Sequence, residues 1–166
     1  MKTGDILLVN HKFDPVGWLI RIVTGGKFHH VAWIINDFVA LEVGARGVNF
    51  GYISRFKNKM FFEYKVLRIP NLTKSDFHIA MSFAYDNMRK HSLLDYLLIA
   101  LSMKFRFQPK GLYTCSGLVA TALSKIGWYF DKNKIPYFIT PVDIEKTKEL
   151  INVTEEFKNM YISSIL

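Results

Sequence analysis

The residue of this 166-residue sequence best suited to covalent catalysis is its single cysteine, Cys115, in the stretch YTCSGLV. Apolar residues follow it at helical spacing: Leu118, Val119, Ala122, Leu123 and Ile126. This spacing predicts that Cys115 lies at or just inside the N-terminus of a helix. There the helix dipole and the first N–H groups stabilise a thiolate and can hold an oxyanion. The competing interpretation is a small buried apolar residue, as most lone cysteines are.

A base for such a nucleophile is offered by His30, in the stretch FHHVAW at the start of a predicted strand. A strand holds a side chain firmly, as a general base requires. Neighbouring strand residues point to opposite faces, so only one of His29 and His30 can face the cysteine. A surface or hydrogen-bonded core histidine is the alternative. No cluster at metal-ligand spacing accompanies the pair, and we expect neither a metal nor an organic cofactor.

Glu42, on the next predicted strand, could orient the imidazole as the third member of a triad. A carboxylate in an apolar strand is costly if it is buried without a partner. With a strict two-residue loop at Asn36 and Asp37, His30 pairs with Val43, and Glu42 faces the wrong way. A three-residue loop or a bulge puts His30 and Glu42 on one face, so the triad hypothesis predicts one of these. A solvent-facing charge is the alternative.

The elements that must position these residues follow the order strands first, helices second. Strands are predicted over 6–9, 30–36, 39–43, 48–53 and 60–69, and a short helix over 16–23. Helices are predicted from Thr73 with a capping box to Asp76, over 93–103, from Cys115 with Gly127 as its C′ residue, and from Thr140. We therefore expect one α+β domain over residues 1–166, with helices packed on a mostly antiparallel sheet.

Composition narrows the function classes. Half of the residues are hydrophobic, which excludes intrinsic disorder, and the formal net charge is +8. The basic residues are spread along the chain, so we expect no nucleic-acid partner, while an anionic membrane surface stays open as a partner. The apolar stretch 93–103 is too short to cross a bilayer and predicts a buried helix, although it could lie against a membrane. We recognise no secretory signal, and a cytoplasmic protein is the expectation.

Five stretches in order, Gly4–Leu7, Thr24–Ala32, Leu41–Val48, Cys115–Val119 and Thr140–Asp143, resemble a known family. It is the circularly permuted papain-like branch of the NlpC-type superfamily, specifically the YiiX/YebB-like group of cysteine hydrolases. In ordinary papain-like enzymes the cysteine helix precedes the histidine strand, whereas the permuted branch has the opposite order, as here. The resemblance implies a permuted papain-like fold. It also implies Cys115 as nucleophile, His30 as base and Glu42 as the polar third member.

Three functions follow as expectations. The first is a cysteine peptidase or amidase that acts on amide, peptide or ester bonds through a thioester acyl-enzyme. The second is a lipid acyltransferase or lipase, because lecithin:retinol acyltransferase is a more distant relative of the resembled group. The third is a binding module without catalysis. The expected partners are accordingly a peptide, an N-acyl compound or a lipid. The residues do not decide among them.

Overall fold

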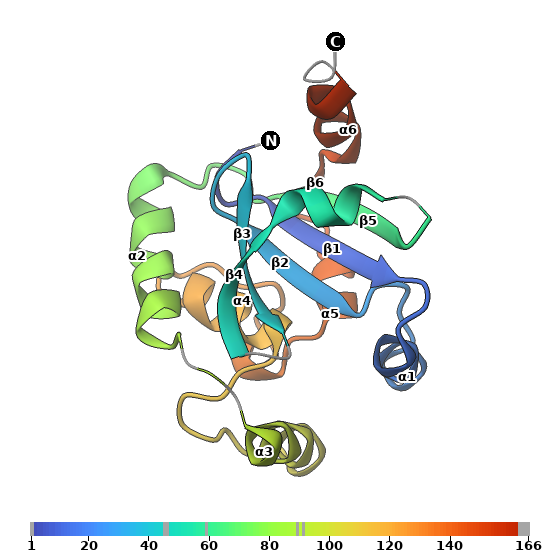
Figure 1. Cartoon of the computed structure of the whole chain (residues 1–166). Helices are drawn as coiled ribbons and strands as arrows, with labels where there is room; N and C mark the ends of the chain where they lie inside the picture. Colours follow the sequence, from blue (N-terminus) through green and yellow to red (C-terminus); the bar gives the residue numbers. More distant parts are fainter. Residues whose placement is uncertain (1, 45–46, 59, 89, 91, 163–166) are drawn as a thin grey trace.

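A six-stranded sheet forms the centre of the computed structural model, which describes residues 2–44, 47–58, 60–88, 90 and 92–162 (Figure 1). The strand order is β4-β3-β2-β1-β5-β6, and every neighbouring pair is antiparallel. The strands are β1 (Ile6–His11), β2 (His30–Ile34), β3 (Val39–Gly44), β4 (Gly47–Tyr52), β5 (Phe62–Arg68) and β6 (Ile151–Asn152). The predicted α+β class with an antiparallel sheet is confirmed.

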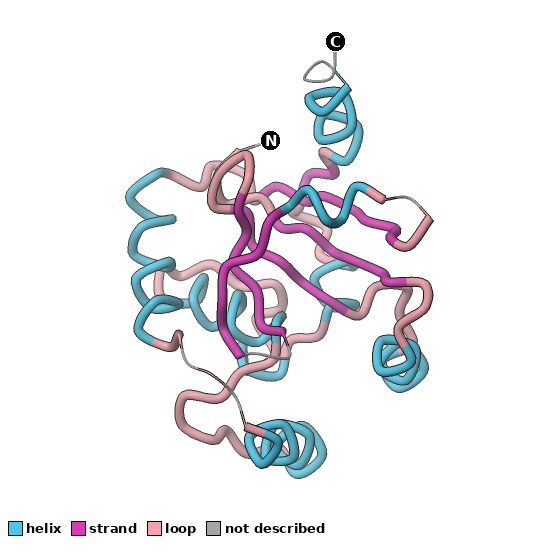
Figure 2. Tube along the Cα trace, in the orientation of Figure 1, coloured by secondary structure: helices cyan, strands magenta, loops and turns pink. Residues whose placement is uncertain are grey.

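Helices cover both faces of this sheet and its margins (Figure 2). They are α1 (Pro15–Thr24), α2 (Lys74–Asp86), α3 (Leu93–Phe105), α4 (Cys115–Ser124), α5 (Pro141–Lys146) and α6 (Thr154–Ile162), with 3-10 turns η1 (Ile53–Lys57) and η2 (Pro136–Phe138). Helices α2 and α4 pack on the face that carries Val31, Trp33 and Leu41. The opposite face, with Ala32 and Ile34, is covered by apolar residues of η1 and α6. The sheet is therefore buried on both sides of β2.

Local signals in the sequence explain where the helices begin. Capping boxes start α2 at Thr73, α3 at Ser92 and α5 at Thr140, where each cap side chain and the aspartate three residues later bond reciprocally to the backbone. The boxes at Thr73 and Thr140 confirm the predictions. Helix α4 ends at Ser124 with Lys125 as its C-cap, so Gly127 is not the C′ residue but lies in the left-handed turn that follows.

The strand predictions hold with small changes at the ends. The first strand continues to His11, and Ile53 begins η1 instead of ending β4. Ala45 and Arg46, within one of the stretches that resemble the permuted family, lie outside the described residues. Strand β6 and helix α6 have no counterpart among the predicted elements. Asp5, in the first of those stretches, has a structural partner, since its buried carboxylate accepts two 2.9 Å bonds from Arg68 of β5.

Helix α3 contradicts the prediction of a buried helix over residues 93–103. Leu94, Leu97 and Leu98 are exposed, and Ile99 and Ser102 form the buried side. Like α1, the helix stands outside the layers that cover the sheet (Figure 1). The segment has more apolar residues than its one buried side can hold, so its composition wrongly predicted a buried helix. Among the described residues, no helix is long and apolar enough to cross a membrane.

Candidate active site

Cys115 is the first residue of α4, as the sequence predicts. The preceding residue, Thr114, has extended backbone angles and caps the helix, because its hydroxyl accepts a 2.9 Å hydrogen bond from the N–H of Gly117. A cysteine in this position meets the positive end of the helix dipole. The side chain is partly exposed, so it is not a fully buried apolar residue.

The two residues after Cys115 fix the helix against η2. The buried hydroxyl of Ser116 donates a 2.6 Å hydrogen bond to the carbonyl of Ile139. A Cβ atom at Gly117 would lie 2.5 Å from the carbonyl oxygen of Tyr137, closer than real contacts allow. Of the two residues that follow Cys115, Ser116 therefore bonds to the segment around η2, and Gly117 lets that segment approach the helix.

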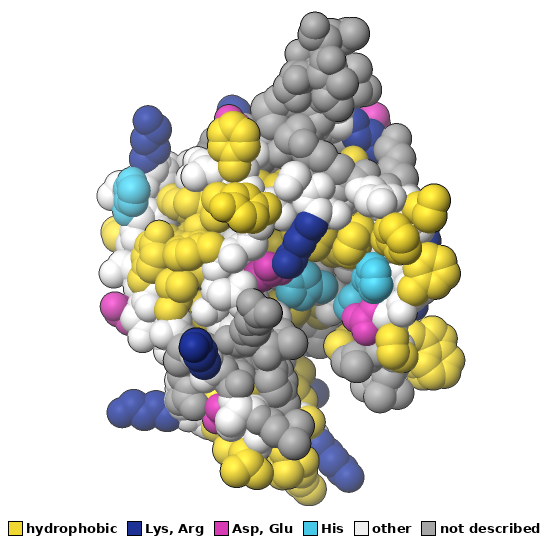
Figure 3. All heavy atoms as spheres, in the orientation of Figure 1, with side chains coloured by type: hydrophobic (Ala, Val, Ile, Leu, Met, Phe, Trp, Pro, Cys, Tyr) yellow, Lys and Arg dark blue, Asp and Glu magenta, His cyan; other side chains and the backbone are white. Residues whose placement is uncertain are grey.

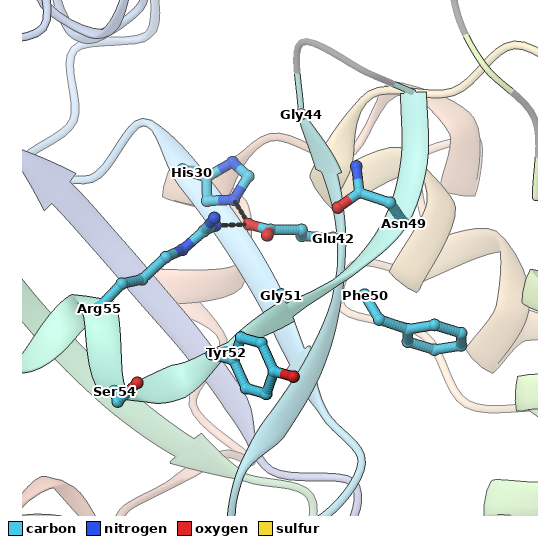
Figure 4. A pocket seen from close by; sticks show the side chains of 9 residues that line it. All are labelled: His30, Glu42, Gly44, Asn49, Phe50, Gly51, Tyr52, Ser54 and Arg55. Atoms are coloured by element: carbon cyan, nitrogen blue, oxygen red, sulfur yellow. Dashed lines mark hydrogen bonds and ion pairs between the residues drawn. The ribbon is translucent and has the colours of Figure 1, made fainter.

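His30 begins β2, and its imidazole is held from two sides. Its Nε2 atom lies 2.8 Å from Oε2 of Glu42 (Figure 4). Its other neighbour is Cys115, whose thiol interacts with the imidazole closely enough to raise the pKa of His30. Because Glu42 occupies Nε2, Nδ1 is the nitrogen left for the sulfur. The cysteine, the histidine and the glutamate predicted from the sequence are thus brought together, with the histidine in the middle.

The hairpin register explains how Glu42 reaches His30. Ala32 pairs with Glu42, so the alternation of side chains puts His30 and Glu42 on the same face of the sheet. The loop between Ile35 and Val39 has three residues, and the Asn36 side chain accepts hydrogen bonds from the N–H groups of Phe38 and Val39. The predicted odd loop is confirmed. The alternative of a solvent-facing Glu42 is wrong, because its side chain is only 4% exposed.

Two residues that the sequence did not single out hold the Glu42 carboxylate. Arg55 of η1 donates to the same oxygen that faces His30. Gly51 of β4 leaves the room for the carboxylate, because a Cβ atom there would collide with Oε1. A glycine inside a predicted strand is a recognised sign of close approach and could have drawn attention to Gly51. Nothing local marks Arg55, whose contact depends on where η1 packs.

These contacts shift the pKa values of the group in a consistent direction. Burial acts to lower the pKa of His30, but its hydrogen bonds and charge interactions with Cys115 and Glu42 outweigh burial and raise the pKa to about 9. Burial acts to raise the pKa of Cys115, but His30 and the backbone N–H groups of Val31 and Ser116 lower it below its usual value. Both shifts favour a thiolate beside an imidazolium.

The pKa of Glu42 completes the charge pattern. Burial alone would raise it, but the bonds to His30 and the charges of His30 and Arg55 hold it below its usual value. The carboxylate is therefore ionised and stabilises the cationic imidazole. Together the four charged groups form an alternating row of sulfur, imidazole, carboxylate and guanidinium.

A cavity of about 750 Å³ opens beside the imidazole on the Glu42 side. Figure 4 shows side chains from β3, β4 and η1 around it, with Arg55 reaching over the carboxylate and Tyr52 across from it. The described side chains include no group of three histidines, cysteines or carboxylates that could bind a metal ion. The arrangement suits proton transfer and nucleophilic attack by sulfur, both of which need a base within hydrogen-bonding reach.

His29, the other member of the histidine pair, faces away from this group. Its buried ring lies 3.3 Å from Asp14 and 3.4 Å from Arg21 of α1. Gly17 of α1 allows this contact, because a Cβ atom there would lie 2.5 Å from the ring. Of the two histidines, His30, the one predicted from the sequence, is the one that meets the cysteine. Compared with known proteins, the chain matches no protein-family model and no curated sequence.

Proposed function

We propose that this protein is a cysteine-dependent hydrolase of amide, peptide or ester bonds, with a permuted papain-like fold. Cys115 is the nucleophile, His30 its base and Glu42 the residue that orients His30. The observation that supports this most strongly is the imidazole held between the thiol at a helix start and a buried carboxylate. The order of the chain, with the histidine strand before the cysteine helix, is the order expected of the permuted branch.

The reaction follows from these roles. The Cys115 thiolate attacks the carbonyl carbon of the substrate, a carbon–sulfur bond forms, and the oxygen becomes an oxyanion. The N–H of Cys115, in the first turn of α4, is a donor for that oxyanion. The His30 imidazolium gives its proton to the leaving nitrogen or oxygen, and the carbonyl re-forms as a thioester. Water then attacks the thioester while His30 takes its proton, and the thiolate leaves as the acid is released.

The proposal is tested by labelling with electrophilic acyl probes and by alkylation with iodoacetamide. The wild type should react through Cys115 well below the pH at which an ordinary thiol ionises, near 8.5. The Cys115→Ser variant, checked for an unchanged fold by circular dichroism, should take up no thiol-directed label. An ordinary thiol reactivity in the wild type would refute the enzyme and favour the binding-module alternative.

A second candidate function, acyl transfer from a lipid, is favoured by one observation. Apolar side chains of α1 and α3 are exposed, among them Trp18 and Leu94. The two functions share the thioester and differ in substrate. Acyl transfer from phospholipid vesicles to an amine or hydroxyl acceptor would support the lipid reaction, and turnover of N-acyl peptides would support the amidase.

A further inference from the structure

The two helices that stand outside the sheet layers present apolar side chains to solvent. On α3, Leu94 is 71% exposed, Leu97 55% and Phe105 64%. On α1, Trp18 is 59% and Ile22 57% exposed. We call these five residues the apolar rim. A surface helix normally turns its apolar stripe to the core, so outward stripes on two helices indicate an interaction surface.

Both helices are held to the protein by buried contacts on their inner sides, which on α3 include the apolar Ile99. On α3, the buried hydroxyl of Ser102 lies 2.9 Å from the hydroxyl of Tyr137. On α1, Gly17 lies against the ring of His29. The outer residues of α3 have the spacing i, i+3 and i+11, which places Leu94, Leu97 and Phe105 on one face of the helix. Because Ile99 and Ser102 are buried while the outer residues are exposed, the residues that hold α3 are not the ones that it presents to solvent.

The charges around the apolar rim are mainly positive. Lys104 and Arg106 are exposed at the end of α3, and Lys12 and Lys27 line the same surface hollow as Trp18 and Ile22. Lys27 is partly neutralised by Glu63, 3.4 Å away. Asp95, the one acidic residue of α3, is engaged in the helix cap with Ser92. Apolar side chains flanked by Lys and Arg are typical of helices that lie in the interface of an anionic membrane.

Figure 3 shows where the apolar rim lies relative to the candidate site. Histidine, acidic and basic side chains gather in the middle of the face shown, and apolar side chains gather over α1 and α3 beside and below them. Both helices also lie at the lower end of the molecule in Figure 1. The two helices and the candidate site are therefore seen on the same face of the molecule.

We infer that the apolar rim docks this protein on an anionic lipid surface, with α1 and α3 lying in the interface and the basic residues contacting the headgroups. A second copy of the chain is a poorer occupant, because each carries a net charge of +8 and the copies repel. The inference goes beyond the proposed function and does not depend on catalysis by Cys115.

The test is co-sedimentation of the full chain with vesicles of phosphatidylcholine alone or mixed with phosphatidylserine. Binding should require phosphatidylserine and weaken as salt is added. The double variant Leu94→Gln/Leu97→Gln should bind at least about tenfold more weakly, since it removes apolar area from the interface. Replacing Lys104 by Gln should cost about fivefold. Cys115→Ala should bind like the wild type, which separates this inference from the proposed function.

A matched control is offered by Ile79 and Ile151, which are 52% and 51% exposed on α2 and β6. Ile79→Gln/Ile151→Gln should bind vesicles like the wild type. A measurement without substitutions is quenching of tryptophan fluorescence by brominated lipids, which should affect the exposed Trp18 and spare the buried Trp33. The inference is overturned if the wild type ignores phosphatidylserine or if the control loses as much binding. It is also overturned if the apolar rim instead mediates dimers without vesicles.

Discussion

His29 and His30 are neighbours in the chain, yet their surroundings move their pKa values in opposite directions. Burial lowers the pKa of His29 to about 4, against an opposing effect of Asp14, and the nearby cations Arg21 and His30 add to the lowering. Burial also acts to lower the pKa of His30, but Cys115 and Glu42 outweigh it and raise the pKa to about 9. The difference shows that burial makes a histidine neutral unless anionic partners are buried with it.

The two rings also serve different purposes. His29 packs α1 to the sheet through Gly17, and its neutral ring accepts or donates hydrogen bonds without a net charge. His30 joins the cysteine helix to the β2–β3 hairpin through a row of charges. We therefore expect substitutions of His29 to change stability, and substitutions of His30 to change the reactivity of Cys115.

The largest effect should come from replacing each histidine by glutamine. His30→Gln removes the cation that stabilises the thiolate, so alkylation of Cys115 near pH 6 should slow by about a hundredfold. His29→Gln leaves that cation in place and should change the rate by less than about twofold. Iodoacetamide uptake followed by mass spectrometry measures both. An equal loss in the two variants would remove the contrast between the histidines.

A second prediction concerns stability in acid. A histidine whose folded pKa is about 4 binds its proton more weakly than in the unfolded chain, where the value is about 6.5. Its contribution is fully present above pH 6.5 and is lost as the pH falls toward 4, a change of up to about 3 kcal/mol. Urea unfolding between these pH values should show the loss in the wild type, and His29→Gln should flatten it.

The sign is reversed for His30. Its raised pKa means that the folded state holds the proton more tightly, so its contribution is present below pH 6.5 and is lost as the pH rises through about 9. The same unfolding series extended to alkaline pH should show a decline that His30→Gln reduces. If His29→Gln instead reduced the alkaline decline, it would be wrong to assign the acidic loss of stability to His29 and the alkaline loss to His30.

A third prediction sharpens the role of the carboxylate. Glu42→Gln keeps the shape of the side chain but removes its charge, so the pKa of His30 should fall by about one unit. The alkaline decline in stability should move to lower pH by the same amount, and the His30 ring resonances in NMR should titrate with it. The matched variant Glu63→Gln, at a partly exposed carboxylate on β5 away from His30, should leave this decline in place.

The smallest effect is expected from a single methyl group. Gly51→Ala places a Cβ atom against the Glu42 carboxylate and should shift the pKa of His30 downward by a few tenths of a unit. The rate of Cys115 alkylation should change by about twofold. Gly44→Ala is the control, since a Cβ atom there meets nothing within 4 Å. NMR titration of His30 distinguishes the two. No difference between them would mean that Gly51 does not determine where the carboxylate lies.

Much of the fold follows from local sequence signals. Capping boxes at Thr73 and Thr140 and the helix start at Cys115 depend on residues within four positions of each other, and the structure has them where the sequence places them. The hairpin register could be predicted only on the assumption that His30 and Glu42 lie on one face of the sheet. Asn36 and Asp37 suggest a two-residue loop, but the Asn36 side chain turns the next two N–H groups toward itself and lengthens the loop to three.

The remaining features depend on contacts between distant segments. Arg55 meets Glu42 only because η1 packs on the face of the sheet that carries Glu42. The partners of His29 are Arg21 of α1 and Asp14 just before that helix, and nothing near His29 in the sequence identifies them. The exposure of α3 was missed because hydrophobic composition does not reveal whether a helix has a core to pack against. Register and helix starts are local properties, whereas the choice of partners is a tertiary one.

The hydrogen bond from Ser116 to Ile139 has a consequence for how the protein is synthesised. His30 and Glu42 belong to a hairpin that can form early on the ribosome, because its strands are joined by only three residues. The helix that carries Cys115 gains its anchor only when residue 139 has left the exit tunnel. A nascent chain therefore holds His30 and the carboxylate that orients it long before the sulfur is set in place. Reactivity at Cys115 should arise late in translation, which protects the unfinished protein and its neighbours from an active thiolate.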